Sequence, residues 1–293
     1  MLLYVMSALV FDGDSFAASL EEELAQEIKL HATETGVVPQ LKIAAVAFMQ
    51  DPGSRLYSEV KRTVATRLGI EYDIHSFDFD DDPNQVLELI KQLNQDPSVT
   101  GIIIQKPSFR SFLRYKSGNH TQDDFRDWWQ AMIMAVLPEK DVDGLTGKAI
   151  VTPATCEAVL KIFDAYDFVP TKLLIIGRSD LVGLPLAAKT KDMGYEVDLV
   201  GKYELKKLKA SFKKLKAYSI IVSATGVHRL IMGNEVANGV KIIDVGEPKA
   251  DFDFKSCFQM ASFITPVPGG VGPMTVISLM QNCWYLYLAH QVK

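Results

Sequence analysis

The chain has 293 residues, of which 48% are apolar and 23% charged, enough for one large or two medium globular domains. Its net charge of −5 argues against nucleic-acid binding, and no run of about 18 apolar residues indicates a membrane span. Cys156, Cys257 and Cys283 are scattered without a paired metal-ligand spacing, a usage typical of a reducing cytoplasm. Residues 1–13 are apolar but lack a basic n-region, and they are interpreted as a first strand rather than a signal peptide.

Strands and helices alternate through the first hundred residues. The predicted elements are a helix at 16–35, a strand at 41–48, a helix at 54–68, a strand at 72–77, a helix at 83–93 and a strand at 101–105. This rhythm predicts βαβ units and therefore a parallel sheet. Residues 106–130 break the rhythm with polar and aromatic side chains, and we expect a loop followed by a helix there.

A second alternation begins near residue 150. It comprises a helix at 156–165, strands at 172–176, 196–200, 220–224 and 241–245, a glycine-rich turn leading into a helix at 177–193, and a basic segment at 202–216. This pattern predicts a Rossmann-like dinucleotide-binding domain at 150–274. The first domain then covers 1–149 together with 275–293, because a final helix at 275–290 is expected to pack back on it. The fold class is α/β with two domains.

The turn after the strand at 172–176 predicts a phosphate site. Gly177, Arg178, Ser179 and Gly183 lie between this strand and the next helix, where backbone N–H groups and a helix N-terminus face an anion. The Gly-x5-Gly spacing differs from the usual Gly-x-Gly-x-x-Gly fingerprint, so the motif alone is weak. Arg178 has a guanidinium that can bind a phosphate through two hydrogen bonds.

Lys202 follows the second strand of this domain, where NAD-specific folds place an acidic residue for the ribose hydroxyls. A cation at that position favours the 2′-phosphate of NADP, with NAD as the other possibility. The alternative is that Lys202 simply begins a solvated basic helix.

In the first domain, Tyr57 and Lys61 share one helix face at i, i+4 spacing. A tyrosine ring can stack on a flat ligand, and a lysine in a dry pocket can take part in acid–base chemistry. Gln105 ends a buried strand, at the edge where parallel sheets bind ligands. The alternative for the Tyr57–Lys61 pair is an ordinary surface pair on an amphipathic helix.

Two further segments contain turn-forming residues that are also candidate functional residues. Asp143 precedes Gly144 in the motif Lys-Asp-Val-Asp-Gly, and its alternative role is that of a turn residue. Residues 265–276 contain three prolines and three glycines directly before the final helix. No core strand tolerates this mixture, so the segment is either a shaped backbone surface facing a ligand or a rigid turn that caps the helix.

Taken together, these motifs resemble the bifunctional methylenetetrahydrofolate dehydrogenase/cyclohydrolase family. The matching segments run in order along nearly the whole chain, from Asp12-Gly13 and Asp51-Pro-Gly-Ser54 to Gly177-Arg-Ser179 and Asp244-Val-Gly246. The Lys-Asp-Val-Asp-Gly motif and the Pro-Gly-Gly-Val-Gly-Pro-Met-Thr motif carry most of the specificity.

The resemblance implies oxidation of 5,10-methylenetetrahydrofolate with NADP, followed by hydrolysis to 10-formyltetrahydrofolate. It implies that Lys61 is the catalytic amine, that Gln105 orients it, that Tyr57 stacks on the folate and that Asp143 accepts hydrogen bonds from the pterin. The folate and nicotinamide are expected to lie in a cleft between the domains. That cleft would be lined by Pro268, Gly269, Gly270, Val271, Gly272, Pro273, Met274 and Thr275. The cofactor would be held by Gly177, Arg178, Ser179, Gly183, Lys202 and Gly246.

The resemblance further implies a cytoplasmic homodimer in one-carbon metabolism and purine biosynthesis, with no metal, nucleic acid or membrane involved. The chain departs from the family pattern after Gln105, before Cys156 and around Lys202. These departures leave cofactor preference open between NADP and NAD. They also leave two alternative functions: a monofunctional NAD(P)-dependent dehydrogenase, and a non-catalytic folate- or nucleotide-binding protein.

Overall fold

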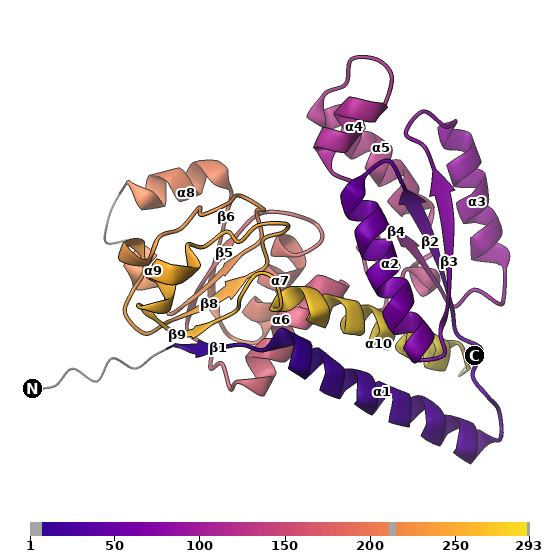
Figure 1. Ribbon diagram of the computed structural model, residues 1–293, viewed down its shortest axis with the longest axis horizontal. Coiled ribbons are helices and arrows are strands. Elements are labelled where there is room, and N and C mark those ends of the chain that lie inside the picture. Colours follow the sequence, from indigo (N-terminus) through magenta and orange to yellow (C-terminus); the bar gives the residue numbers. More distant parts are fainter. Residues whose placement is uncertain (1–7, 211–214, 292–293) are drawn as a thin grey trace, which may run out of the picture. The chain divides into compact units, whose positions relative to one another are not determined.

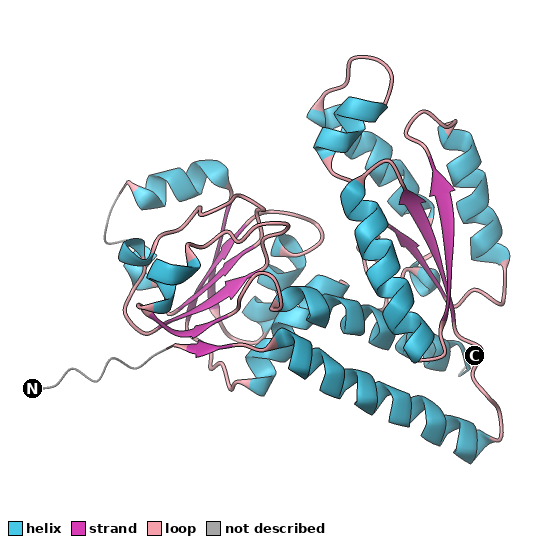
Figure 2. Cartoon of the chain, in the orientation of Figure 1, coloured by secondary structure: helices cyan, strands magenta, loops and turns pink. Residues whose placement is uncertain are grey.

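The computed structural model describes residues 8–210 and 215–291 and has two compact α/β units (Figure 1). Unit 1 contains the described residues up to Ser19 together with Thr155–Thr275, and unit 2 contains Leu20–Ala154 and Val276 onward. Strands and helices alternate within each unit (Figure 2). The predicted two-domain α/β fold class is confirmed.

Unit 2 is built on a three-stranded parallel sheet. Its order is β3-β2-β4, with β2 at Lys42–Phe48, β3 at Glu71–Phe77 and β4 at Gly101–Ile104. The central strand β2 buries six consecutive residues, as expected for a parallel strand covered on both faces. Because all three strands run in one direction, their carboxyl ends meet at one edge of the sheet.

Two helices of unit 2 begin with the same local chemistry. Helix α2, at Pro52–Arg67, follows the N-cap Asp51, and α3, at Pro83–Gln95, follows the N-cap Asp82. Each cap carboxylate accepts a backbone N–H of the first turn, and proline occupies a first-turn position that needs no donor. These signals place both helix starts within two residues of the sequence prediction.

Residues 106–130, where the predicted alternation of strands and helices is interrupted, contribute to two helices rather than one. These are α4 at Phe109–Tyr115 and α5 at Gln122–Ala135. The N-cap of α5 is Thr121, whose side chain forms a reciprocal capping box with Asp124. A 3-10 turn, η1, follows at Pro138–Lys140. Aromatic contacts join the two helices to the end of β2 and to Phe79, within the unit 2 core. This aromatic core explains the extra length of the excursion.

Unit 1 contains a six-stranded parallel sheet in the order β1-β9-β8-β7-β5-β6. Its strands are β1 Leu9–Val10, β5 Lys172–Ile176, β6 Glu196–Val200, β7 Ile220–Ser223, β8 Val240–Asp244 and β9 Ala261–Ile264. Its helices include α6 Ala154–Ala165, α7 Gly183–Asp192, α8 Lys202–Lys209 and α9 Phe254–Phe258, with 3-10 turns η2 Leu215–Ala217 and η3 Gly233–Glu235. Helix α9 and strand β9 were not predicted: α9 is only five residues long, and the sequence of β9, Ala-Ser-Phe-Ile, is not a continuous apolar run. Part of the predicted basic segment, residues 211–214, lies outside the described residues.

The N-terminal strand differs from the sequence prediction in its placement. The expectation assigned residues 1–149 to the first domain, whereas β1 pairs with β9 and extends the sheet of unit 1. The short run Leu9–Val10 finds its hydrogen-bonding partner in a strand more than 250 residues later, which no local pattern shows. Residues 1–7 of the predicted first strand lie outside the described residues.

Two long helices have residues in both units: α1 at Gly13–Thr35 and α10 at Val271–Gln291. From Val276 onward, α10 belongs to unit 2, as the sequence predicted for the final helix. There the Asn282 side-chain amide donates to the carbonyls of Val142 and Thr152, each at 3.0 Å. These two bonds tie the helix to the segment that carries Asp143.

Among the described helices, none is both long enough and apolar enough to cross a membrane. The thiols of Cys156, Cys257 and Cys283 are all free and buried.

Candidate active site

The centre of the candidate site in unit 2 is a buried amine. Lys61 lies on α2 with only 7% of its surface exposed, and its Nζ donates to Gln105 Oε1 at 2.8 Å. Gln105 directly follows β4, and its backbone N–H donates to Val46 O at 2.8 Å, which continues the sheet pairing. A lysine so deeply buried is rare unless polar partners compensate for the loss of water. The surface-pair alternative for Lys61 is therefore wrong.

The N-terminus of α2 is held next to the segment after Gln105. The Asp51 carboxylate accepts the Ser54 N–H at 2.7 Å and the Ser108 hydroxyl at 2.8 Å. Burial alone would raise the pKa of Asp51, but hydrogen bonds from Ser111, Ser54 and Ser108 together lower it. This ionised cap links the helix that carries Lys61 to the strand that places Gln105.

Asp143 interacts electrostatically with Lys61. Burial raises the pKa of the Asp143 carboxyl to about 6, the Lys61 charge acts in the opposite direction, and Asp141 adds to the increase. The main chain is positioned by a bridge between Asp141 and Ile102 of β4, and by Gly144 with φ of 73°. A Cβ at residue 144 would also come within 2.6 Å of Pro153 N. The raised pKa, together with the influence of the Lys61 charge, keeps Asp143 a candidate functional residue as well as a turn residue.

Tyr57 lies one helical turn before Lys61 on α2 and is half-buried. Unit 2 therefore brings Lys61, Gln105 and Asp143 together, with Tyr57 on the same helix. Tyr72 of β3 is a further residue near this group that the sequence did not indicate. Within the described part of the chain its hydroxyl is buried and has no hydrogen-bond partner, and burial together with the charges of Asp143 and Glu59 raises its pKa. A tyrosine in a strand carries no local signal that would distinguish it from a core residue.

Residues 265–270 of the proline- and glycine-rich segment form a close-packed turn in unit 1 that leads directly into α10. Gly13 N donates to Gly269 O at 2.9 Å, and a Cβ on Gly13 would lie 2.0 Å from Gly270 O. Gly269 has φ of 85°, and the Val267–Pro268 peptide bond is cis. Helix α10 starts at Val271, four residues earlier than predicted, so Val271, Gly272, Pro273, Met274 and Thr275 form its first turn.

Side-chain burial divides this segment into two parts. Val271 and Met274 are buried in the core, whereas Pro268 is exposed and Gly269, Gly272, Pro273 and Thr275 are half-buried. The side chains of Val271 and Met274 therefore anchor the helix.

The predicted cofactor turn of unit 1 is a narrow backbone cradle. Gly177 has φ of 113°, and a Cβ there would lie 2.6 Å from Ala224 O. A Cβ on Gly183, the first residue of α7, would lie 1.7 Å from Gly177 O. Ser179 closes the turn, because its Oγ accepts the Val182 N–H at 3.2 Å. This close approach of strand and helix fits the diphosphate of a dinucleotide.

Three further predicted cofactor residues lie near the carboxyl ends of this sheet. Arg178 follows Gly177 and is about half exposed, and Lys202 is the exposed first residue of α8. Gly246 follows β8, and its N–H donates to Asp244 Oδ1 at 2.9 Å. A Cβ on Gly246 would lie 2.4 Å from Asp251 Oδ1, so a larger residue there would have to displace the Asp251 side chain. Burial raises the pKa of Asp244 to about 6.

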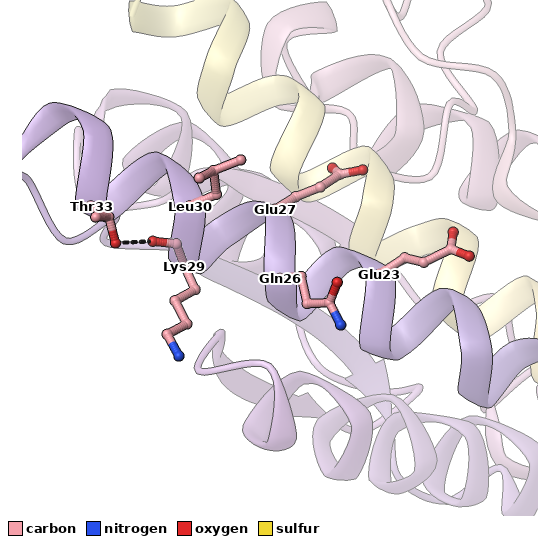
Figure 3. A pocket seen from close by; sticks show the side chains of 6 residues that line it. All are labelled: Glu23, Gln26, Glu27, Lys29, Leu30 and Thr33. Carbon is pink, nitrogen blue, oxygen red and sulfur yellow. Dashed lines mark hydrogen bonds between the residues drawn. The ribbon is translucent and has the colours of Figure 1, made fainter.

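A surface pocket along α1 lies elsewhere in unit 2 (Figure 3). It is lined by six residues of this single helix: Glu23, Gln26, Glu27, Lys29, Leu30 and Thr33. None of them is a predicted site residue. Within residues 8–210 and 215–291, no cluster of His, Cys, Asp and Glu is placed to hold a metal ion.

Two family models match the chain. The tetrahydrofolate dehydrogenase/cyclohydrolase catalytic domain matches residues 11–143, and the NAD(P)-binding domain of the same family matches residues 153–291. A relative from Lactobacillus helveticus, named bifunctional protein FolD, is 33% identical over 290 residues, which cover 93% of this chain and 95% of the relative.

Solved structures agree in fold. A 5,10-methylenetetrahydrofolate dehydrogenase from the silkworm Bombyx mori has a TM-score of 0.82 at 29% identity, covering 98% of this chain and 100% of that one. A bifunctional FolD enzyme from Campylobacter jejuni has a TM-score of 0.82 at 26% identity, covering 97% and 100%. The resemblance drawn from the motifs is confirmed, and the chain belongs to the tetrahydrofolate dehydrogenase/cyclohydrolase family, with a catalytic and an NAD(P)-binding domain.

Proposed function

We propose that this enzyme oxidises 5,10-methylenetetrahydrofolate to 5,10-methenyltetrahydrofolate with NADP and then hydrolyses the product to 10-formyltetrahydrofolate. Family membership supports the reaction class. The single observation that carries the proposal is the buried Lys61 amine, bonded to Gln105 and electrostatically coupled to Asp143. A monofunctional dehydrogenase has less need of this arrangement, because the amine mainly serves hydrolysis.

The roles proposed for the catalytic residues follow from their positions. Lys61 assists proton transfer and the attack of water, and Gln105 holds its Nζ in one orientation. Asp143 accepts hydrogen bonds from the pterin, and Tyr57 stacks on the folate. Because Lys61 is buried and its amine is held by a rigid strand end, water can be directed to the reacting carbon without a mobile base.

The chemistry of the second step suits this set of residues. Loss of hydride leaves a cationic methenyl carbon that is bonded to two nitrogens. Water attacks this carbon once a base removes its proton and the surroundings orient it. The bond between the carbon and N5 then breaks, N5 takes up the proton, and the carbon stays on N10 as the formyl group. The positioned Lys61 amine is proposed to meet the first requirement. Asp143, a carboxyl whose pKa burial raises to about 6, is proposed to meet the second by orienting the pterin.

The nicotinamide cofactor, when bound, supplies the hydride acceptor. We propose that Gly177, Ser179 and Gly183 hold its diphosphate and that Gly246 lets the backbone approach it closely. The tight strand–helix junction, in which any Cβ at residue 183 would collide with Gly177 O, supports this assignment. Arg178 and Lys202 are the cations proposed for the 2′-phosphate of NADP, and NAD is accepted as well. The backbone of residues 268–275 is proposed to contact the folate and the nicotinamide.

We further propose that residues 1–149 and 275–293 act as the folate domain and residues 150–274 as the cofactor domain, apart from the placement of β1 described above.

The proposed partner is a second copy of the chain. In support, β6 lies at an open edge of the unit 1 sheet, where another strand can pair. A cytoplasmic location is supported by three free, buried thiols. Light scattering coupled to size exclusion tests the dimer.

One assay separates the three candidate functions. Protein, NADP and 5,10-methylenetetrahydrofolate are mixed, and methenyl absorbance and 10-formyl product are followed together. Transient methenyl absorbance with formyl product supports the bifunctional enzyme. Accumulated methenyl without accelerated hydrolysis identifies a monofunctional dehydrogenase. Absence of both products, with folate still bound, identifies a binding protein.

A further inference from the structure

The carboxyl ends of β5 and β6 bring two charged residues together that sequence reasoning had not paired. Residues Ile176 and Val200 are in register, and Gly177 N donates to Val200 O at 3.0 Å. Arg178 after β5 and Glu204 near the start of α8 are therefore neighbours across the edge of the sheet. In dinucleotide-binding folds, the residues at the end of this second strand contact the adenosine ribose.

Glu204 is held by two contacts. Its Oε1 lies 3.0 Å from Arg178 Nη2, and its Oε2 accepts the Gly201 N–H at 3.1 Å. Arg178 Nη2 also donates to Leu199 O at 3.2 Å. The pKa of the Glu204 carboxyl is lowered, first by a hydrogen bond from its own backbone amide and then by the Arg178 charge and the Gly201 N–H. The carboxylate is therefore ionised at neutral pH, and Arg178 is engaged by it.

This pair has opposite consequences for the two cofactors. A ribose 2′-hydroxyl can donate to the Glu204 carboxylate, as an acidic residue does in NAD-specific folds. A 2′-phosphate is repelled by the same carboxylate and must compete with it for Arg178. Both groups are about half exposed, so the pair can open for a stronger anion.

We propose that Glu204 is a specificity-determining residue that lowers the preference of this enzyme for NADP and thereby admits NAD. This inference rests on the proposed cofactor site but not on the folate chemistry. Its test therefore uses the binding of nucleotide fragments rather than turnover.

The full-length enzyme is titrated with 2′,5′-ADP and with 5′-AMP by calorimetry, and the ratio of the two dissociation constants is compared among variants. Glu204→Gln keeps the side-chain size and removes the charge. It should raise the relative affinity for 2′,5′-ADP by about tenfold, the scale of one charge-assisted hydrogen bond. Affinity for 5′-AMP should stay the same or weaken.

The control is Glu196→Gln, which removes the same charge at the amino end of β6, where Glu196 pairs with Lys172 at 2.9 Å. It should leave the ratio unchanged. Arg178→Gln should reduce the preference for 2′,5′-ADP. Adding Glu204→Gln to it should shift the ratio toward 2′,5′-ADP by less than Glu204→Gln does alone, because only the direct repulsion of the 2′-phosphate is then removed. Thermal unfolding checks that each variant is folded.

An unchanged ratio in Glu204→Gln, or an equal shift in Glu196→Gln, overturns the proposal. Equal changes in both fragment affinities also overturn it, because they mean that Glu204 acts on the fold rather than on the 2′ position. If the wild type binds neither fragment, the proposed cofactor site itself is wrong, a result that leaves the folate assay unaffected.

Discussion

Lys61 Nζ donates to Gln105 Oε1 at 2.8 Å, joining helix α2 to the end of strand β4 across 44 residues of sequence. This bond places a buried amine at the edge of the sheet where ligands bind in α/β folds. The proposed hydrolysis depends on it.

Replacing the amine tests its role directly. Lys61→Ala should reduce hydrolysis of 5,10-methenyltetrahydrofolate by about 100-fold or more, the usual contribution of a positioned proton-transfer group. Folate affinity, measured by calorimetry, should change much less. Lys91→Ala on α3, where the lysine side chain is 66% exposed, is the matched control and should retain full activity. A Lys61→Ala enzyme with the full hydrolysis rate would refute the catalytic assignment.

The pH dependence of hydrolysis should report Asp143. Because burial raises the pKa of this carboxyl to about 6, the group becomes ionised as the pH rises through that value. Its carboxylate can then accept the hydrogen bonds proposed from the pterin, so the rate should rise between about pH 5 and pH 7. Asp143→Asn should flatten this limb of the profile. If the limb persists in Asp143→Asn, another group is responsible for it.

The cofactor cradle should tolerate no side chain at Gly183. A Cβ there would lie 1.7 Å from Gly177 O, so Gly183→Ala must displace the turn. NADP affinity should fall by about tenfold or more, equivalent to ~1.4 kcal/mol. Leu184→Ala, at the neighbouring exposed position, is the control and should bind normally. Unchanged NADP affinity in Gly183→Ala would separate this turn from the cofactor site.

The exposed lysine at the start of α8 provides a separate test of 2′-phosphate recognition. Lys202→Ala should weaken NADP binding by about tenfold and NAD binding very little, because only NADP carries the extra phosphate. Lys206→Ala, exposed on the same helix, serves as the comparison. Equal losses in both variants would indicate a general effect of the basic helix, the alternative interpretation of Lys202.

The N-cap of α2 should contribute to stability in a pH-dependent way. Asp51→Ala should lower the free energy of unfolding by about 1–2 kcal/mol, measured by urea denaturation, while Asp51→Asn should lose less. The pKa of Asp51 is lowered in the folded state. The stabilisation of wild type over Asp51→Ala is therefore fully present above the unfolded value of about 3.9, and it should disappear as the pH falls through the folded value. A difference that does not depend on pH would mean that the carboxylate charge is not what stabilises the cap.

Much of the fold could be predicted locally, because apolar runs, helical periodicity and Asp–Pro helix starts act over a few residues. Gln105 and Asp143 could be selected because one ends a strand and the other lies in a specific motif. Helix α9 was missed because five residues show little helical periodicity, and β9 was missed because Ser262 interrupts its short apolar run. Tyr72 and Glu204 were also missed, because a strand tyrosine and one acidic residue in a basic helix carry no local mark of their neighbours.

The sequence by itself determined the α/β class, the family and the residue types of both sites, because these depend on local pattern and on motifs. Only the tertiary structure decided which distant residues meet. Strand β1 joins β9, Lys61 meets Gln105, and Arg178 pairs with Glu204. In a parallel sheet, neighbouring strands are separated by a crossover of a dozen or more residues, so contacts at their ends depend on strand order rather than on sequence distance.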